Sequence, residues 1–431
     1  MNQKFLTRQA VILAAGKSTR TYPLTLTKPK PLLKVAGRTI IEHNLEQLTG
    51  IVDEVYIVVG YKAEMIKEFV GSKFKGLNIK YVVQEEPLGN ADALMKVEKH
   101  IKGKFILMFG DDLYSKKDIK KLLKYDNAIL AQKVESPEQF GVLKIKDGVF
   151  AEVVEKPKFF ISDLVNIGCF SFTKDIFAVL KKIKLSKRNE YELTDAYNLL
   201  AKEKKIKVIA VKDYWLPVTF PWSLLEANEY SLKNHFKENP PNFPISSMKQ
   251  ALLQGGKRNP LCPPFTKEEE KIERGVQIRG KLAIGSGTVI KSGVYIEGNV
   301  KIGKNCVIGP NCYLRGAITI GDGCHIGQAV EIKNSIIGDG VNVAHLSYVG
   351  DSIIGDNVNI AAGNITANLR FDGKNIKLPV NGNIQDTGRK KLGVIIGDNC
   401  KTGINVSFYP GVKINPNSWI LPGEIVKKDI N

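Results

Sequence analysis

The sequence lacks the features that would hold the protein in a membrane or direct it out of the cell. No apolar run approaches the roughly 20 residues that a membrane-spanning helix needs, although 43% of the residues are hydrophobic. The first residues, MNQKFLTRQA, contain no apolar core like that of a secretory signal. We therefore expect no membrane partner and a cytoplasmic location.

Zinc-site spacings are also absent. The chain has five histidines and six cysteines, and no two cysteines form a C-x-x-C pair. Structural zinc sites place their ligands at short, regular spacings of that kind. We interpret the cysteines as reduced packing residues: Cys169, Cys262, Cys306, Cys312, Cys324 and Cys400.

A single basic tract is missing as well, although the net charge is +19. The lysines are dispersed and interleaved with acidic residues, as in EEEKIER, whereas nucleic-acid-binding proteins gather their positive charge. We therefore expect no nucleic-acid partner. A Lys-rich solvated surface accounts for part of the charge, and sites for phosphorylated substrates account for the rest.

The hydrophobic pattern divides the 431 residues into two domains and a linker. Residues 1–236 alternate short β-branched runs with helical patterns, which predicts an α/β domain with a mainly parallel sheet. The expected strands are 11–13, 55–59, 79–83 and 105–109, and the expected helices include 91–99 and 193–202. Residues 237–274, rich in Pro and charge, are expected to be a linker, and residues 275–431 form the second domain.

The second domain repeats every six residues. An aliphatic residue occupies each sixth position, and Gly often follows it, which is the hexapeptide pattern of a parallel β-helix. The pattern slips near Gly338 and is interrupted from Asn364 to Leu392, where we expect a loop. The repeating positions are Ile278, Ile284, Ile290, Ile296, Ile302, Ile308, Leu314, Ile320, Ile326 and Ile332.

The stretch AVILAAGKSTRTYPLTLTKPKPLL reads as a strand followed by a cationic loop. Gly16-Lys17-Ser18 looks like the end of a P-loop, but Val11 stands where that motif needs Gly. The small residues of the turn let backbone amides approach phosphate oxygens, while Arg20 and Lys30 are placed to neutralise a triphosphate. We interpret the stretch as a nucleotide-handling loop.

Several motifs resemble known enzymes. LAAGKSTRTYPLTLTKPKPLL resembles the G-x-G-T-R and P-K-P signature of sugar-1-phosphate nucleotidylyltransferases, with Ser18 in place of the second Gly, and VVQEEPLGNADAL, FGDD, FGVL, VVEKP and VNIGCFSF follow in family order. RGAITIG, VEIK and AHLSYVGDSIIGDNVNIAAGNITANLRFDG resemble the bifunctional N-acetylglucosamine-1-phosphate uridylyltransferase/glucosamine-1-phosphate acetyltransferases, in their archaeal form. The resemblance implies a Rossmann-like mixed sheet followed by a left-handed parallel β-helix.

The first domain would then transfer a nucleotidyl group to a sugar 1-phosphate. Positioning and charge neutralisation do most of the work in such a reaction. Arg20 and Lys30 are assigned to the triphosphate and the leaving pyrophosphate, and Asp111, at a strand end, to Mg²⁺. Ala14 and Gly16 are expected to line the nucleotide site with their backbone.

The base and the sugar have their own expected contacts. The amide of Gln84 offers a donor and an acceptor to the imide edge of uracil or thymine, and Gly89 leaves room for the base, so UTP or dTTP is expected. By resemblance, the sugar is contacted by Gly141, Glu155, Lys156 and Asn166, although Lys156 reads equally well as a surface cation. Where the family often has a second carboxylate, this chain has Pro217. Either Asp112, Asp213 or water replaces that ligand, or one firmly held Mg²⁺ suffices.

Two cations of the β-helix are predicted to stack. Arg315 and Lys333 each follow an aliphatic of the repeat and stand 18 residues apart. With three hexapeptides per coil, as in the resembling fold, they lie one coil apart at about 4.8 Å. Such a pair repels unless an anion such as a sugar phosphate lies between them, and the alternative is that both point into solvent.

The remaining polar residues of the β-helix match the acetyltransferase. The resemblance places His345 as the general base that takes a proton from the glucosamine amine as it attacks acetyl-CoA. Asn368 would orient the amine or His345. Leu369 stands where the bacterial pattern has Tyr, so galactosamine-1-phosphate stays open beside glucosamine-1-phosphate. The residues expected around the sugar phosphate, besides Arg315 and Lys333, are Tyr348, Asn359, Lys374 and Lys377.

Three functions compete. The favoured one is a bifunctional enzyme of UDP-N-acetylglucosamine synthesis that uses Mg²⁺ and acetyl-CoA. The second is a nucleotidylyltransferase whose β-helix only assembles the oligomer, and the third is a regulatory subunit without activity. Retention of Arg20, Lys30, Asp111 and His345 argues against the third. Resembling β-helices associate around a threefold axis, so we expect a homotrimer.

Overall fold

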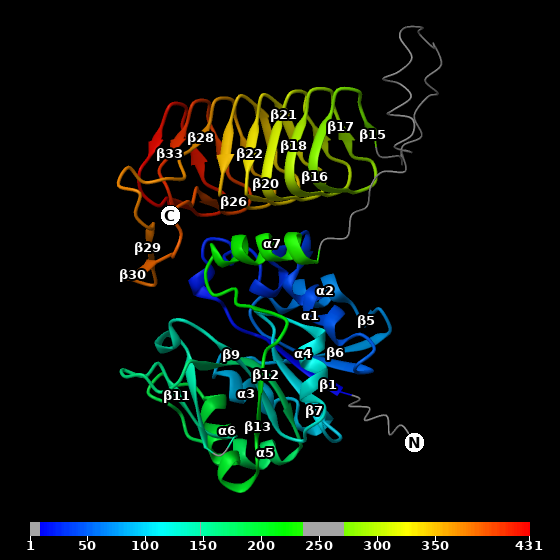
Figure 1. The fold of residues 1–431 in the computed structure, drawn as a ribbon, viewed down its shortest axis with the longest axis vertical. Helices are drawn as coiled ribbons and strands as arrows, with labels where there is room; N and C mark the ends of the chain where they lie inside the picture. The colour runs from blue at the N-terminus through cyan, green and yellow to red at the C-terminus, as the bar shows by residue number, and fades with distance from the viewer. Residues whose placement is uncertain (1–8, 147, 236–270) are drawn as a thin grey trace. The chain divides into compact units, whose positions relative to one another are not determined.

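The computed structural model describes residues 9–146, 148–235 and 271–431, which form two units by their contacts (Figure 1). The first unit contains the residues up to Ser18 together with 28–33 and 38–219. The second contains residues 19–27 and 34–37 and the chain from Phe220 onward. The expected boundary at residue 236 and most of the expected linker, 237–274, lie outside the described residues.

The first unit is built on a ten-stranded mixed sheet. Strand β1 (Gln9–Ala14) runs parallel to β4 (Glu54–Val59) and β7 (Phe105–Phe109), and β4 runs parallel to β6 (Leu77–Val83). These four strands confirm the predicted ones. The prediction of a mainly parallel sheet holds for these four strands, whereas most pairings in the rest of the sheet are antiparallel. The other strands are β5 (Lys73–Phe74), β9 (Ala128–Lys133), β10 (Gly141–Lys146), β11 (Val149–Glu155), β12 (Leu164–Phe172) and β13 (Lys207–Ala210).

Helices cover both faces of this sheet, since alternate residues of its strands enter two separate hydrophobic clusters. Val11 and Leu13 pack on one face with α3 (Asn90–Met95), α5 (Asp175–Leu180) and α6 (Leu193–Glu203). Ala10 and Ile12 pack on the other with α1 (Ile40–Leu48), α2 (Ala63–Val70) and α4 (Lys116–Leu122). Helix α3 ends earlier than the expected Lys99. Within the described residues, no helix combines the length and the apolar character that a membrane span requires.

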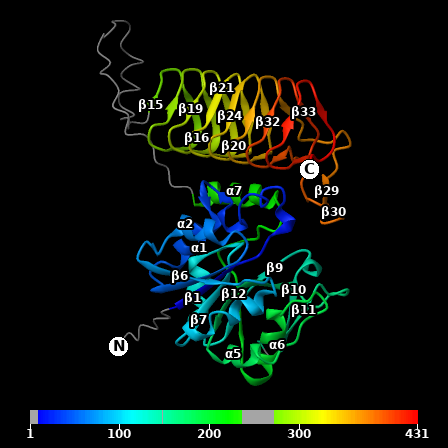
Figure 2. The same cartoon turned by 180° about the vertical axis from the view of Figure 1, so that it is seen from behind.

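The second unit is a parallel β-helix (Figure 2). Strand β16 (Gln277–Ile284) pairs in parallel with β18 (Tyr295–Ile302), which pairs in parallel with β20 (Tyr313–Ile320). Ile278, Ile296 and Leu314 stand opposite one another in this register, so each coil advances the chain by the predicted three hexapeptides. A second wall of the coils is formed by β15 (Lys271–Ile272), β17 (Val289–Ile290), β19 (Val307–Ile308), β21 (His325–Gln328), β24 (Asn342–His345), β27 (Asn359–Ile360), β32 (Lys401–Thr402) and β35 (Trp419–Ile420).

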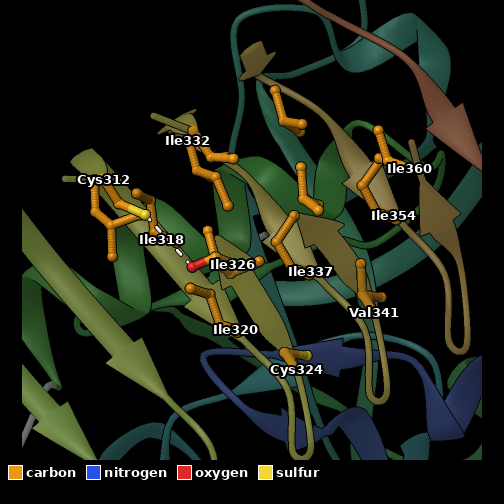
Figure 3. Packing of buried hydrophobic residues seen from close by; sticks show 14 of the residues in the cluster. Cys312, Ile318, Ile320, Cys324, Ile326, Ile332, Ile337, Val341, Ile354 and Ile360 are labelled. Carbon is orange, nitrogen blue, oxygen red and sulfur yellow. Dashed lines mark hydrogen bonds between the residues drawn. The ribbon is translucent and has the colours of Figure 1, made fainter. Parts of the chain in front are cut away.

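The aliphatic positions of the repeat form the core of the β-helix. Side chains such as Ile320, Ile326 and Ile332 stack along its interior (Figure 3). Nine of the ten predicted positions are buried, and Ile278 is 40% exposed. Among the strands that the structure describes, β16 pairs with β18 alone, so none of them covers Ile278 on its other side.

The slip and the interruption in the repeat have structural counterparts. Ile320 pairs with Ile337 and Ile337 with Ile354, so the coil is one residue shorter here than in the preceding coils. In the next coil, Ile354 in β26 (Ile353–Ile354) pairs with Ile396 in β31 (Ile395–Ile396), so an insertion lies between these two paired positions. The intervening insertion carries the antiparallel hairpin of β29 (Lys377–Val380) and β30 (Asn383–Asp386).

Helix α7 (Ser223–Asn234) packs on the β-helix, although the sequence analysis placed it in the first domain. It contacts β18 and β20. Its buried Asn228 donates to the Ala317 carbonyl at 3.4 Å and accepts from the Thr319 hydroxyl at 2.7 Å. An amphipathic helical pattern shows that a helix buries one face, but it does not show against which partner.

Candidate active sites

The first candidate site lies at the carboxyl ends of the parallel strands, where open α/β sheets bind ligands. β1 and β7 are neighbours, so the turns that follow them share one edge. Lys30, in the 3₁₀ turn η2 (Lys30–Leu32), places its ammonium 2.9 Å from Asp111 Oδ2. The Lys30 side chain is 4% exposed and that of Asp111 is 39% exposed. The buried cation is therefore neutralised by a carboxylate that reaches solvent.

The adjacent Asp112 is partly buried and binds the segment that contains Pro217. Its Oδ1 accepts from the Val218 backbone at 3.0 Å, and its Oδ2 accepts from Trp215 Nε1 at 3.1 Å. Burial, reinforced by the Asp111 carboxylate, raises the pKa of Asp112. Asp213 in turn accepts from the Ser115 hydroxyl at 2.6 Å. Both alternatives for a second metal ligand thus already have structural partners.

A metal ion at this site would have few protein ligands. In the part of the chain that the structure describes, no group of three or more His, Cys, Asp or Glu side chains is arranged to hold a metal. Asp111 is partly exposed and offers the hard carboxylate oxygen that Mg²⁺ prefers. One carboxylate fits Mg²⁺, which usually binds proteins through one or two carboxylates together with water and substrate phosphates.

The loop after β1 is divided between the two units. Ala14 ends β1 and Gly16 follows with open space around its Cβ position. Ser18 has a φ of +52°, the left-handed conformation that favours Gly, which explains why Gly is common at this point in the resembling motif. Arg20 is exposed in the turn η1 (Thr19–Thr21), which groups with the second unit. That segment is held there by Thr27, whose hydroxyl donates to Asp398 Oδ2 at 2.6 Å.

Gln84 and Gly89, the two residues predicted to meet the base, are in contact. Gln84 follows β6 and is 6% exposed. Its Nε2 donates to the Gly89 carbonyl at 3.0 Å and to Asp92 Oδ2 at 2.8 Å. Gly89 has a φ of +97°, and a Cβ there would lie 2.6 Å from the Tyr191 carbonyl, so only Gly fits.

The four expected sugar-binding residues come from three adjoining strands. Gly141 pairs with Glu155 across β10 and β11, and Lys156 follows with a φ of +44° and an exposed side chain. Asn166, in β12, donates to the buried Tyr197 hydroxyl at 2.9 Å and accepts from the Gly168 amide at 3.0 Å. Glu155 and Lys156 are thus accessible, while the Asn166 amide is held in a fixed orientation.

The second candidate site is on the β-helix, where Arg315 and Lys333 occupy opposite positions in adjacent strands. This register, between β20 and β22 (Glu331–Lys333), confirms that they lie one coil apart. Each cation has its own acidic partner. Arg315 lies 2.6 Å from Glu331 Oε1, and Lys333 lies 2.6 Å from Asp351 Oδ2. The repulsion expected between the cations is therefore relieved within the chain, without an anion between them.

Asp351 connects Lys333 to Asn368 and, through it, to Tyr348. Asp351 is almost fully buried and also accepts from Asn368 Nδ2 at 2.5 Å. Asn368 Nδ2 lies 3.0 Å from the hydroxyl of Tyr348, in β25 (Tyr348–Gly350). Burial, followed by the negative charges of Asp351 and Glu331, raises the pKa of Tyr348 and keeps its phenol neutral. Three predicted residues are thus joined by one carboxylate that the sequence analysis missed.

The other predicted residues of this site lie at exposed positions. His345 ends β24 and Asn359 begins the neighbouring β27, on the other wall of the coils. Lys374 and Lys377 are exposed on the insertion, and neither makes a hydrogen bond to the Asp351 group in the described structure. The structure therefore groups Lys333, Tyr348 and Asn368 and leaves the side chains of His345, Asn359, Lys374 and Lys377 exposed.

Sequence reasoning missed Asp92, Asp351 and Glu331. Asp92 lies in the quoted motif GNADAL and Asp351 in YVGD. Both positions stand beside motif residues, but the sequence does not show which acidic side chains are buried. Because acidic residues usually lie on the surface, the sequence assigned no role to these three.

Known proteins resemble both parts of the chain. Residues 9–234 match the nucleotidyl transferase family model, and residues 294–387 match the model of the GMPPB C-terminal domain. The chain is 39% identical over 98% of its length to the bifunctional protein GlmU of Methanocaldococcus jannaschii, covering 95% of that protein. It is 37% identical to the bifunctional sugar-1-phosphate nucleotidylyltransferase/acetyltransferase of Sulfurisphaera tokodaii, covering 98% of each chain.

A shorter relative matches the first unit. UTP–glucose-1-phosphate uridylyltransferase AglF of Haloferax volcanii is 37% identical over 51% of this chain and 95% of its own length. The fold and the first site thus define a nucleotidyl transferase. With both domains matched over the full chain, the protein belongs to the family of bifunctional sugar-1-phosphate nucleotidylyltransferase/acetyltransferases, as the sequence motifs predicted.

Proposed function

We propose that the protein makes a nucleotide-activated N-acetylhexosamine in two steps, by acetylating a hexosamine 1-phosphate with acetyl-CoA and by transferring a uridylyl group from UTP, or a thymidylyl group from dTTP, to the sugar phosphate. The family assignment supports an enzyme with both activities. The observation that carries the first activity is the contact between buried Lys30 and exposed Asp111 at the carboxyl ends of β1 and β7.

In nucleotidyl transfer, a sugar phosphate oxygen attacks the α-phosphorus of the nucleotide and pyrophosphate leaves. Lys30 and Arg20 neutralise the triphosphate and the leaving group, and Asp111 holds Mg²⁺. The metal supplies charge neutralisation for the phosphates when bound. Gln84 and Gly89 accept the base, and Gly141, Glu155, Lys156 and Asn166 contact the sugar. The backbone at Ala14 and Gly16 lines the triphosphate.

In acetyl transfer, the hexosamine amine attacks the thioester of acetyl-CoA and coenzyme A leaves as a thiol. His345 takes the proton of the amine. Lys333, Arg315, Tyr348, Asn359, Lys374 and Lys377 surround the sugar phosphate, and Asn368 orients the amine or His345. Glucosamine-1-phosphate and galactosamine-1-phosphate are both candidate substrates.

We also propose that the enzyme is located in the cytoplasm and that it forms a homotrimer. The five cysteines that the structure describes are free and buried, which fits a reducing compartment. Trp419, Leu421 and Ile425 are exposed apolar side chains of the later coils, and we propose that they contribute to self-association.

One incubation tests both activities. Purified protein is given Mg²⁺, acetyl-CoA, glucosamine-1-phosphate and UTP, and the products are identified by mass. UDP-N-acetylglucosamine, free coenzyme A and pyrophosphate are the expected products. In a second incubation, N-acetylglucosamine-1-phosphate replaces glucosamine-1-phosphate. Pyrophosphate release in the second incubation, without coenzyme A release in the first, would show a nucleotidylyltransferase with a structural β-helix. If no nucleotide or sugar yields either product, the protein would be a regulatory subunit.

A further inference from the structure

The side-chain amide of Gln84 is held by two acceptors at once. Its Nε2 donates to the Gly89 carbonyl at 3.0 Å and to the Asp92 carboxylate at 2.8 Å. A glutamine amide has two N–H donors, so both are used inside the protein. The Oε1 atom is left to meet a ligand as an acceptor.

Both partners of Gln84 are fixed in place. The Gly89 carbonyl also accepts from the Ala93 amide at 3.1 Å, at the start of α3. Asp92 is 5% exposed, and its other oxygen, Oδ1, lies 3.2 Å from the Lys96 ammonium. An ionised carboxylate only accepts hydrogen bonds, so turning the amide over would place Oε1 against two acceptors.

We infer that Asp92 is a positioning residue that fixes the Gln84 amide with Oε1 toward the nucleotide and thereby selects among pyrimidine bases. The inference rests on the nucleotidyl transfer proposed above. Uracil and thymine carry a hydrogen on N3 and donate it to Oε1. Cytosine has no hydrogen on N3, so its lone pair would face the Gln84 oxygen. A site built to hydrogen-bond one group rejects the analogue that lacks it.

The test compares UTP with CTP as substrates, using pyrophosphate release in the presence of sugar 1-phosphate. The Asp92→Asn variant keeps the size of the side chain, but its amide can donate to Oε1 of a reversed Gln84. We expect the ratio of kcat/KM for UTP to that for CTP to fall about tenfold. The Gly89 carbonyl still favours the original orientation, so part of the preference remains.

Two further variants make the test specific. Asp92→Ala removes the acceptor without adding an amide, and it is expected to lower the same ratio if Asp92→Asn does not fold. Lys96→Ala removes the other contact of Asp92 and is the matched control, with the ratio expected to stay within about twofold of wild type. A purely structural role for Asp92 would lower both rates together and leave the ratio unchanged.

The outcomes separate this inference from the proposed function. A wild-type preference for UTP that persists in both Asp92 variants, despite folded protein, overturns the inference alone. Wild-type protein that uses CTP as readily as UTP overturns both the inference and the base selection proposed for Gln84. A ratio that falls in the Asp92 variants but not in Lys96→Ala establishes the inference.

Discussion

The ammonium of Lys333 lies 2.6 Å from the carboxylate of Asp351, and both side chains are largely buried, with 15% and 3% of their surfaces exposed. Lys333 is the cation proposed to bind the sugar phosphate, and Asp351 also accepts from Asn368. The proposed phosphate ligand is therefore also one half of a buried ion pair between adjacent coils.

Lys333→Ala is expected to raise the KM for hexosamine 1-phosphate in acetyl transfer about tenfold or more, with a smaller change in kcat, because the cation binds the phosphate in both the ground and transition states. The variant also leaves Asp351 buried without its cation, which costs about 3–5 kcal/mol of stability in buried pairs. Kinetics and thermal unfolding measure the two effects.

The double variant Lys333→Met/Asp351→Asn separates the effect on substrate binding from the effect on stability. It removes both charges, so the unfolding temperature should rise above that of Lys333→Ala while KM stays high. A KM that recovers together with stability would show that Lys333 acts only through folding.

Asp111→Asn is expected to lower pyrophosphate release by roughly a hundredfold or more, the scale of losing one preorganised electrostatic group. Acetyl transfer should be unaffected, because its residues lie on the β-helix. The matched control is Asp126→Asn, a change at an exposed acid outside the site. Comparable pyrophosphate release by Asp111→Asn and wild type would remove Asp111 from the mechanism.

His345→Ala is expected to lower the kcat of acetyl transfer by roughly two orders of magnitude or more, the usual contribution of a general base, with little change in the affinity for the sugar phosphate. Coenzyme A release is the readout, and uridylyl transfer by the same sample is the control for folding. If His345→Ala keeps full acetyl transfer, His345 is not the general base, and the β-helix would be assigned to assembly of the oligomer only.

Light scattering is expected to give about three times the chain mass of 47.7 kDa. Leu421 is 71% exposed on the late coils, and Leu421→Glu should shift the protein toward smaller species, because a charge at a self-association surface is costly to bury. Leu185→Glu, at a 50% exposed leucine of the first unit, is the control. A wild-type monomer at working concentration would contradict the homotrimer.

Two isoleucines at equivalent positions of successive coils test the core of the β-helix. Ile296 is fully buried, whereas its partner Ile278 is 40% exposed. Ile296→Ala should lower the free energy of unfolding by about 2–5 kcal/mol, and Ile278→Ala should lower it by less than half as much because it leaves a smaller cavity. Denaturant unfolding measures both, and equal losses would mean that the end coil is covered in solution.

The sequence by itself determined the two architectures and most of the candidate residues. The six-residue period placed Ile284 to Ile332 in the core, because each coil buries the same positions again. The apolar runs predicted β1, β4 and β7, since parallel strands that are buried on both faces are continuously apolar. β6 is less apolar and alternates buried with exposed positions at its start. Lys30, Asp111 and Gln84 were found because they stand in motifs whose spacing follows from local strand and turn geometry.

The tertiary structure decided what those residues touch. Lys333 with Asp351, Gln84 with Asp92, and Asp112 with Trp215 are contacts between parts of the chain separated by 18, 8 and 103 positions. The packing of α7 on β20 is of the same kind. Local patterns record which face of an element is apolar, but the partner of a buried polar group is fixed only when the whole fold brings both into one low-dielectric interior, where each such group must find a hydrogen bond.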